Sequence, residues 1–130
     1  MIENIKPEVI EAMLDSMPIE ISFVNENDVV SYFNKNGDRI FPRPRSVVGK
    51  KVTQCHPSKS VDKVLQILDA FKKGERNVAE FWINLGEKKV YIRYFPVRDK
   101  NGRYLGTLEV SQDITNIKSI EGEKRLLDWK

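Results

Sequence analysis

Apolar residues recur every three or four positions between Pro7 and Pro18. This spacing places them on one side of a helix, and proline suits the first turn of a helix but interrupts its interior. The pattern therefore predicts a flanking helix within residues 1–18, whose apolar side needs another surface to lie on.

Two short segments with a strand-like pattern follow, over residues 19–25 and 29–34. The polar residues 26–28 between them form a connection of the length that β-hairpins use. Residues 34–46 are rich in Gly, Pro and Asn, so we expect at most a short helical turn there.

A long helical pattern covers residues 58–75. Its apolar stripe is made of Val61, Val64, Leu65, Leu68 and Phe71. Gly74 suits the C-terminal end of a helix, because glycine readily adopts the backbone conformation found there. The pattern predicts a helix that packs on the domain through this stripe.

After Gly74 the period changes from helical to alternating. Residues 77–86, 88–99 and 103–114 predict three strands, and the short turns between them favour an antiparallel meander. Both faces of these strands carry apolar residues, so each face of the sheet needs a cover. We expect the long helix to cover one face, and the opening helix or a second subunit to cover the other.

Residues 115–130 return to helical spacing, with Thr115 as the expected N-cap. Gly122 costs about 1 kcal/mol relative to alanine inside a helix. Because so short a helix is not stable alone, the pattern predicts a tail helix that packs on the domain or on a partner chain.

Together these elements predict an α+β fold. Its centre is a five-stranded antiparallel sheet with helices on one face, flanked by an N-terminal and a C-terminal helix. The expected organisation is a flanking helix in residues 1–18, a core in residues 19–114 and a C-terminal helix in residues 115–130.

The chain has 130 residues, of which 40% are hydrophobic and 32% charged. This composition is typical of a single soluble globular domain. No apolar run approaches the roughly 20 residues of a membrane span, and the N-terminus lacks the pattern of a signal peptide. These observations predict a cytoplasmic protein that has no contact with a membrane.

The sequence offers little for catalysis or for metal binding. One cysteine and one histidine exclude an intrachain disulfide and cannot supply the four ligands of a structural zinc site. Cys55 and His56 are neighbours in an extended segment, where adjacent side chains seldom face each other, so His56 is a poor base for Cys55. Glu80 and Glu109 are interpreted as surface residues or ion-pair partners of Arg93. We therefore expect no enzyme activity and no metal site.

Positive charge is concentrated between Arg39 and Lys63. Against the single acid Asp62 stand Arg39, Arg43, Arg45, Lys50, Lys51, Lys59 and Lys63. Such a basic stretch can bind an anion or nucleic acid, but no recognition-helix pattern accompanies it. A solvated face is the simpler interpretation, and nucleic-acid or anion binding through residues 39–63 is kept as an alternative function.

Three segments resemble the PAS domain family. They are YFNKNGDRIF (residues 32–41), VVGKKVTQCHP (47–57) and GRYLGTLEVSQDIT (102–115), the last of which ends in Asp-Ile-Thr as PAS strands do. CHPSKSV, EFWINL and YIRYFPVRD more narrowly resemble the PAS-type module that accompanies hemerythrin-like domains in prokaryotic proteins. With one histidine, this chain cannot itself build a hemerythrin di-iron site.

The resemblance implies a sensory or protein-interaction module. In such a module the curved sheet and the long helix enclose a pocket for a small ligand, and the signal leaves through flanking helices, often in a homodimer. The implied partner is a downstream signalling domain or a hemerythrin-like domain. The candidate pocket residues are Tyr32, Asn34, Phe41, Cys55, His56, Phe71, Phe81 and Tyr94.

Three interpretations of the adjacent Cys55 and His56 remain open. In the first, His56 or Ser58 caps the start of the long helix next to Pro57, and Cys55 packs as a small apolar residue. In the second, His56 is an axial haem ligand of a redox or gas sensor, with Cys55 or Met13 as a conceivable second ligand. In the third, the pair lines a pocket for a small organic ligand or responds to redox state.

Overall fold

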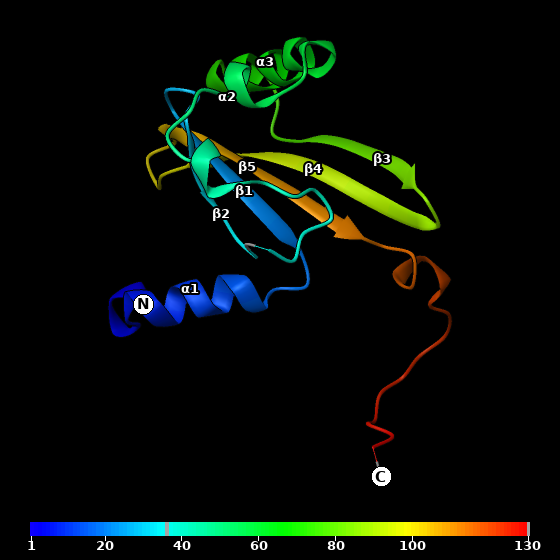
Figure 1. Ribbon diagram of the computed structural model, residues 1–130. Coiled ribbons are helices and arrows are strands. Elements are labelled where there is room, and N and C mark those ends of the chain that lie inside the picture. Colours follow the sequence, from blue (N-terminus) through cyan, green and yellow to red (C-terminus); the bar gives the residue numbers. More distant parts are fainter. Residues whose placement is uncertain (36, 130) are drawn as a thin grey trace.

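The computed structural model describes residues 1–35 and 37–129, which fold around one five-stranded antiparallel sheet (Figure 1). The strands are β1 (Glu20–Asn25), β2 (Val30–Phe33), β3 (Ala79–Leu85), β4 (Lys88–Arg98) and β5 (Tyr104–Asp113). The helices are α1 (Pro7–Ser16), α2 (Val52–Cys55) and α3 (Ser58–Lys72), and the 3₁₀ turns are η1 (Ile2–Asn4), η2 (Arg45–Val47) and η3 (Ile117–Ser119). The predicted α+β fold and its antiparallel sheet are confirmed.

The strand order is β2-β1-β5-β4-β3, so the last strand of the chain lies in the middle of the sheet. Strands β3, β4 and β5 form the predicted meander, and β5 then pairs with β1, from Glu20 opposite Ser111 to Asn25 opposite Gly106. A Cβ atom at Gly106 would lie 2.3 Å from the carbonyl oxygen of Val24. Strand β1 can therefore approach β5 this closely only because position 106 is glycine.

Polar side chains fix two of the predicted turns. Between β1 and β2, Asn25 Oδ1 accepts hydrogen bonds from the backbone N–H groups of Asn27 and Val29. Between β4 and β5, Asp99 Oδ1 accepts hydrogen bonds from the N–H groups two and four residues later. Asn and Asp are suited to turns because they can make such local bonds to the backbone.

Helix α3 buries three of the five residues of the predicted apolar stripe, whereas Leu65 is exposed. Its buried residues are Val64, Leu68 and Phe71. Two of them share a core cluster with Val30 of β2 and Val52 of α2. Gly74 adopts a φ of +73° just beyond the helix, a conformation that favours glycine. The glycine therefore ends the helix as the sequence predicts.

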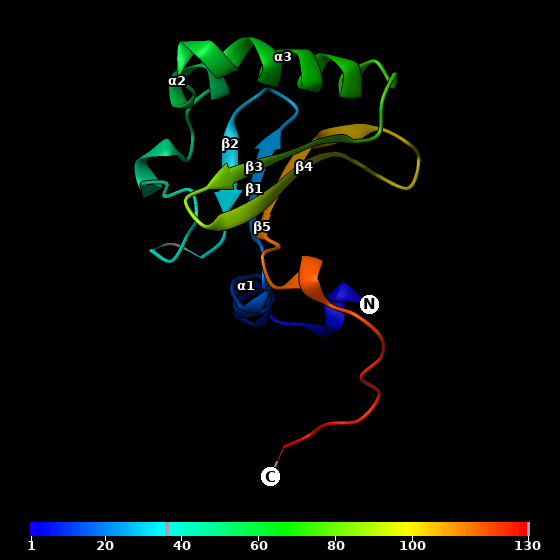
Figure 2. The same cartoon turned by 90° about the vertical axis from the view of Figure 1, so that its right-hand side faces the viewer.

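The sheet has helices on both sides. Helices α2 and α3 lie against one side, here called the inner face, and α1 lies beyond the other side, the outer face (Figure 1, Figure 2). The buried Asn34 ties α1 to the sheet. Its Nδ2 donates to the carbonyl oxygens of Leu14 (2.7 Å) and Ile19 (3.2 Å), and its Oδ1 accepts the N–H of Ile21 (2.7 Å).

The tail helix predicted for residues 115–130 is wrong over the described part of that segment. Within residues 115–129 only η3 is helical, and the chain then runs on without helix (Figure 1). Gly122 has a φ of +63°, outside the right-handed helical region, and Ile120 and Leu127 are exposed. Because these apolar side chains are exposed, packing does not offset the nucleation cost of a short helix. Lys130 lies outside the described residues.

Helix α2 was not predicted from the sequence. It has four residues, of which only Val52 is buried. The backbone N–H of Lys51 donates to Gln54 Oε1 over 3.0 Å and satisfies one donor at its start. A helix this short carries no apolar repeat that a pattern could detect.

Candidate functional site

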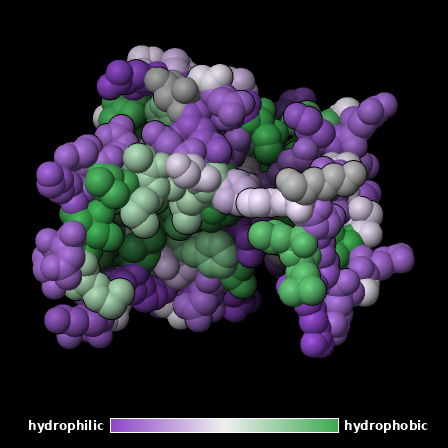
Figure 3. Space-filling model, turned by 90° about the horizontal axis from the view of Figure 1, so that it is seen from below, coloured by the Kyte–Doolittle hydropathy of each residue, from purple (hydrophilic) through white to green (hydrophobic). Residues whose placement is uncertain are grey.

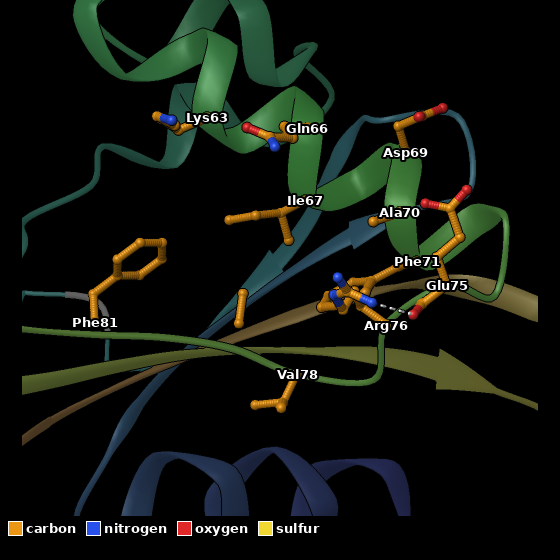
Figure 4. Close-up of a pocket in the computed structure, with 11 residues that line it drawn as sticks. Lys63, Gln66, Ile67, Asp69, Ala70, Phe71, Glu75, Arg76, Val78 and Phe81 are labelled. Atoms are coloured by element: carbon orange, nitrogen blue, oxygen red, sulfur yellow. Dashed lines mark hydrogen bonds between the residues drawn. The ribbon is translucent and has the colours of Figure 1, made fainter.

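A cleft lies between α3 and β3 (Figure 4). It has a volume of about 550 Å³ and is lined by Lys63, Gln66, Ile67, Asp69, Ala70, Phe71, Glu75, Arg76, Val78, Ala79 and Phe81. In Figure 4, Ile67 points from α3 into the cleft and Phe81 stands on β3 facing it. The lining therefore combines apolar walls with charged and polar side chains from α3 and from the connection that follows it.

The cleft exists because α3 packs on β4 and β5 and leaves β3 without a cover. The side chains of β3 that alternate onto the inner face are exposed as a result, including Phe81 (43% exposed) and Ile83. On the opposite wall, Phe71 is completely buried. One wall of the cleft is thus fixed in the core, and the other is open to solvent.

The strand register places a row of side chains between the cleft and the interior of the domain. Ala79 of β3 lies opposite Tyr94 of β4, and Tyr94 lies opposite Glu109 of β5. Glu109 in turn lies opposite Ser22 of β1. Residues directly opposite on neighbouring strands point to the same face of a sheet. These four side chains, here called the inner row, cross the inner face from the wall of the cleft.

Tyr94 is the member of the inner row next to the cleft wall. Its ring meets the ring of Phe81 edge to face, with the centroids 6.1 Å apart and the planes at 86°. Burial raises the pKa of Tyr94, and the negative charge of Glu109 raises it further. The phenol therefore stays protonated at neutral pH and can donate a hydrogen bond.

Glu109 pairs with Arg43, which lies in the segment between β2 and α2. Arg43 Nη2 donates to Glu109 Oε2 over 3.3 Å, and the two side chains are 14% and 17% exposed. Arg43 Nε is buried and has no hydrogen-bond partner among the described residues. Two opposite charges with unused hydrogen-bonding capacity therefore lie on the inner face within reach of solvent.

A second ion pair is closed to solvent. Arg39 Nη2 lies 3.7 Å from Glu20 Oε1, and both side chains are only 3% exposed. Glu20 also accepts the backbone N–H groups of Ile40 (2.6 Å) and Phe41 (2.9 Å). Arg39 donates from Nε to the carbonyl oxygen of Phe41 and from Nη1 to that of Asn34. This pair holds the segment after β2 against the sheet and is structural.

A family model described as PAS domain matches residues 10–115, which is most of the chain. The chain belongs to the PAS domain family. The crystal structure of the C-terminal domain of a Streptococcus mutans protein is 34% identical to this PAS domain, with a TM-score of 0.84. That match covers 90% of this chain and 91% of the other. The resemblance seen in the sequence is thereby confirmed, and with it the sensory class of the module.

Two more distant crystal structures share the fold. A sensory box sensor histidine kinase from Vibrio cholerae is 15% identical over 83% of this chain and 90% of that one, with a TM-score of 0.58. The PAS domain of a Colwellia psychrerythraea protein is 14% identical over 84% and 97% of the two chains, with a TM-score of 0.59. At these identities the likeness concerns the fold alone. A comparison with curated proteins gives no match.

The PAS fold brings together three of the predicted pocket residues. Phe71 and Phe81 line the cleft, and Tyr94 packs against Phe81. Asn34 is occupied by its bonds to α1 and β1, and the backbone of Phe41 takes part in the closed ion-pair network. Neither of these two lines the cleft.

Tyr32 lies away from the cleft. It lines a separate hollow of about 330 Å³ together with Glu11 and Asp15 of the α1 helix. Its hydroxyl is buried without a hydrogen-bond partner among the described residues, and burial raises the pKa of Tyr32. The hollow and the cleft share no lining residue.

Cys55 and His56 lie at the junction of α2 and α3. Cys55 packs against the core cluster, and His56 Nδ1 lies 2.9 Å from the carbonyl oxygen of Val52, the first residue of α2. The N-cap of α3 is Pro57, and no side chain caps this helix. The capping part of the first interpretation is therefore corrected, because the His56 side chain contacts the Val52 carbonyl of α2 and caps no backbone group of α3. Haem ligation by His56 and a pocket role for the pair stay predictions.

Two arginines of the basic stretch turn inward, which the charge pattern along the sequence did not indicate. Arg39 and Arg43 form ion pairs with acidic residues of the sheet, so they do not belong to a solvated face. Nucleic-acid binding by the remaining cations stays a prediction. The sequence did indicate that Glu109 needs a partner, because Glu109 alternates in phase with Thr107 and Ser111 along the same strand. Polar side chains that share one face of a central strand need buried partners.

The Asp113-Ile114-Thr115 motif has a fixed geometry at the end of β5. Asp113 Oδ1 accepts hydrogen bonds from the N–H (3.0 Å) and the hydroxyl (2.5 Å) of Thr115. These bonds lower the pKa of Asp113. Thr115 Oγ1 accepts the N–H of Lys89 (3.0 Å), and Ile114 N–H donates to the carbonyl oxygen of Lys89 (2.8 Å). The motif thus ties the exit of β5 to the start of β4.

Within residues 1–35 and 37–129, no group of three or more His, Cys, Asp or Glu side chains is placed to hold a metal ion. In the same described ranges, no helix combines the length and the apolar character required to cross a bilayer.

Proposed function

We propose that this PAS domain is a sensor that binds a small organic ligand in the cleft between α3 and β3. The observation that carries the proposal is the open apolar wall of β3, which faces Phe71 across a space of about 550 Å³. Ligand sites are typically apolar clefts of about 300–1,000 Å³ with a few polar groups. A ligand that covers Phe81 and its neighbours removes apolar surface from water, which is favourable.

The same wall supports a route for the signal. Phe81 on β3 contacts Tyr94 on β4, and β4 is bonded through Lys89 to the motif that ends β5. A ligand between α3 and β3 would favour one position of β3 over another and would thereby shift a balance between two arrangements of the sheet. We propose that the segments flanking the core, above all the residues after Thr115, carry this shift to a downstream partner.

The cleft can be tested with the fluorescent dye 8-anilinonaphthalene-1-sulfonate, which binds exposed apolar sites. Ala70 lines the cleft from α3, so Ala70→Phe places a ring in the space that the dye would occupy. We expect dye titrations to show binding about tenfold weaker or more in this variant than in the unmodified protein.

The matched control is Ala12→Phe, which adds the same ring to an exposed position of α1. This variant is expected to bind the dye as the unmodified protein does. Circular dichroism establishes that both variants are folded. Equal dye affinity in all three proteins would exclude the cleft as the binding site.

We also propose that the domain forms a homodimer through α1. A groove of about 220 Å³ on this side is lined by Ile2, Ile5, Ile10, Met13, Leu14 and Met17. Met13 and Met17 are exposed, and Figure 3 shows hydrophobic side chains over this region of the surface. In a two-fold symmetric dimer, this patch on one protomer packs against the same patch on the other, which removes both patches from water.

Sedimentation velocity tests the dimer. We expect the full chain to sediment as a dimer and Met13→Glu to sediment as a monomer, because an interface that buries an unpaired carboxylate loses affinity. Leu126→Glu, at an exposed position of the tail, is the control and is expected to remain dimeric. A dimer that survives Met13→Glu, or a monomeric unmodified chain, would contradict the proposal.

A further inference from the structure

We propose that Arg43 and Glu109 are the polar end of the ligand site and that they bind the two charged groups of a zwitterion, an α-amino acid with an apolar side chain. The apolar side chain of this ligand lies in the cleft between α3 and β3. The inference rests on the proposed function and deepens it, because it names the chemical class of the ligand.

Arg39 and Arg43 differ in how far their hydrogen-bond donors are used. Arg39 donates to the carbonyl oxygens of Phe41 and Asn34 and to Ser22 Oγ. Its Cζ atom also lies 5.3 Å from the centroid of the Phe33 ring. A side chain with these partners serves the fold and has little capacity left for a ligand.

Arg43 differs from Arg39 in this respect. Among the described residues its guanidinium makes one hydrogen bond, to Glu109, and its buried Nε makes none. A buried donor without a partner is unfavourable, and it gains when a ligand supplies an acceptor. The guanidinium fork is suited to a carboxylate, since two of its N–H groups can bind both oxygens.

Glu109 offers the complementary capacity. Its Oε2 accepts from Arg43, and the carboxylate is also a hydrogen-bond partner of the Tyr94 hydroxyl, which together leave lone pairs for a further donor. A carboxylate accepts several hydrogen bonds, and an ammonium group is a strong donor. The side chains of Arg43 and Glu109 are 14% and 17% exposed, whereas those of Arg39 and Glu20 are each 3% exposed. The pair of Arg43 and Glu109 is therefore the one that solvent can reach.

Charge balance selects a zwitterion over an ion of one sign. A carboxylate that binds Arg43 alone would lie beside the negative charge of Glu109, and an amine that binds Glu109 alone would lie beside Arg43. Either ion would leave one uncompensated charge in a poorly solvated place. An amino acid sets its carboxylate against Arg43 and its ammonium against Glu109, so that every charge has an opposite neighbour.

The spacing of the inner row matches such a ligand. Ala79 at the cleft wall and Glu109 are separated by two strand spacings, or about 10 Å. An amino acid that hydrogen-bonds to Glu109 and extends a large apolar side chain toward the wall spans this length. Tyr94 lies between the two ends, so a ligand that occupies both displaces its ring from Phe81.

The first test needs only the unmodified protein. Titrations followed by NMR chemical shifts compare L-phenylalanine with 3-phenylpropionate, which lacks the ammonium group, and with phenethylamine, which lacks the carboxylate. We expect L-phenylalanine to bind at least about tenfold more tightly than either analogue, the effect of losing one charged hydrogen bond. Equal affinities for the three compounds would overturn the inference.

Variants then assign the charged groups. Arg43→Gln is expected to weaken L-phenylalanine about tenfold or more and to strengthen phenethylamine, because the like charge beside the amine is removed. Glu109→Gln is expected to weaken L-phenylalanine and to strengthen 3-phenylpropionate for the corresponding reason. Arg103→Gln and Glu26→Gln, which remove an exposed ion pair, are the controls and should bind as the unmodified protein does. Unchanged L-phenylalanine affinity in both inner-face variants would refute the assignment.

The dye experiment separates this inference from the proposed function. If the dye binds in the cleft but none of the three compounds does, the zwitterion is wrong and the cleft still stands as a ligand site. If neither the dye nor the compounds bind, the cleft itself fails as a site, and the inference fails with it.

Discussion

Arg39→Met is expected to lower the free energy of unfolding by about 3–5 kcal/mol, because it leaves the carboxylate of Glu20 buried without its cation. Arg39 and Glu20 are each only 3% exposed, and the pair holds the segment after β2 on the sheet. Methionine preserves much of the volume of the aliphatic part of arginine. The decrease in the free energy of unfolding therefore comes mainly from the lost charge and its hydrogen bonds, and less from a cavity.

Urea unfolding followed by circular dichroism measures this effect. Arg103→Met is the matched control, because Arg103 pairs with Glu26 on the exposed surface, where such pairs contribute about 0–1 kcal/mol. Adding Glu20→Gln to Arg39→Met should restore part of the lost stability, because a neutral amide is less costly to bury than an unpaired carboxylate. Similar losses for Arg39→Met and Arg103→Met would show that the closed pair has no special role.

The strands and the long helix could be predicted because their signals are local. The stripe that contains Val64 and Leu68 repeats with the helical period, and Gly74 marks its end within the same stretch of sequence. The turn residues Asn25 and Asp99 act on backbone groups at most four residues away. Such interactions join residues that are close along the chain, so a sequence pattern can predict them.

The candidate site could be predicted only in part, because its geometry depends on contacts between distant segments. Phe71 and Phe81 were named from their aromatic character, but the cleft between them depends on which strands α3 covers. The pair of Arg43 and Glu109 joins residues 66 positions apart. Its existence follows from the pairing of β5 with β4 and β1, which no local pattern reports.

The tail shows the opposite error, where a local pattern predicted structure that the rest of the chain does not support. Ile120 and Leu127 have helical spacing, yet they are 74% and 71% exposed. Apolar spacing indicates a helix only where another surface buries the apolar side. The pattern in the tail therefore predicts a helix that would form only where a partner buries its apolar side. It does not predict the structure of the chain alone.

The two phenylalanines of the cleft are expected to differ sharply in what they contribute to stability. Phe71→Ala should lower the free energy of unfolding by about 3–5 kcal/mol, because Phe71 is completely buried and its removal leaves a cavity under α3. Phe81→Ala should lower it by about 1 kcal/mol or less, because Phe81 is 43% exposed on the open wall. Urea unfolding measures both values under the same conditions.

The comparison also separates stability from ligand binding. Phe81→Ala is expected to weaken dye binding in the cleft while the domain remains folded, since the ring forms the open wall without supporting the core. A loss of stability in Phe81→Ala as large as that in Phe71→Ala would mean that β3 is packed against the core. In that case the wall would not be free to receive a ligand, and the cleft would not be a binding site.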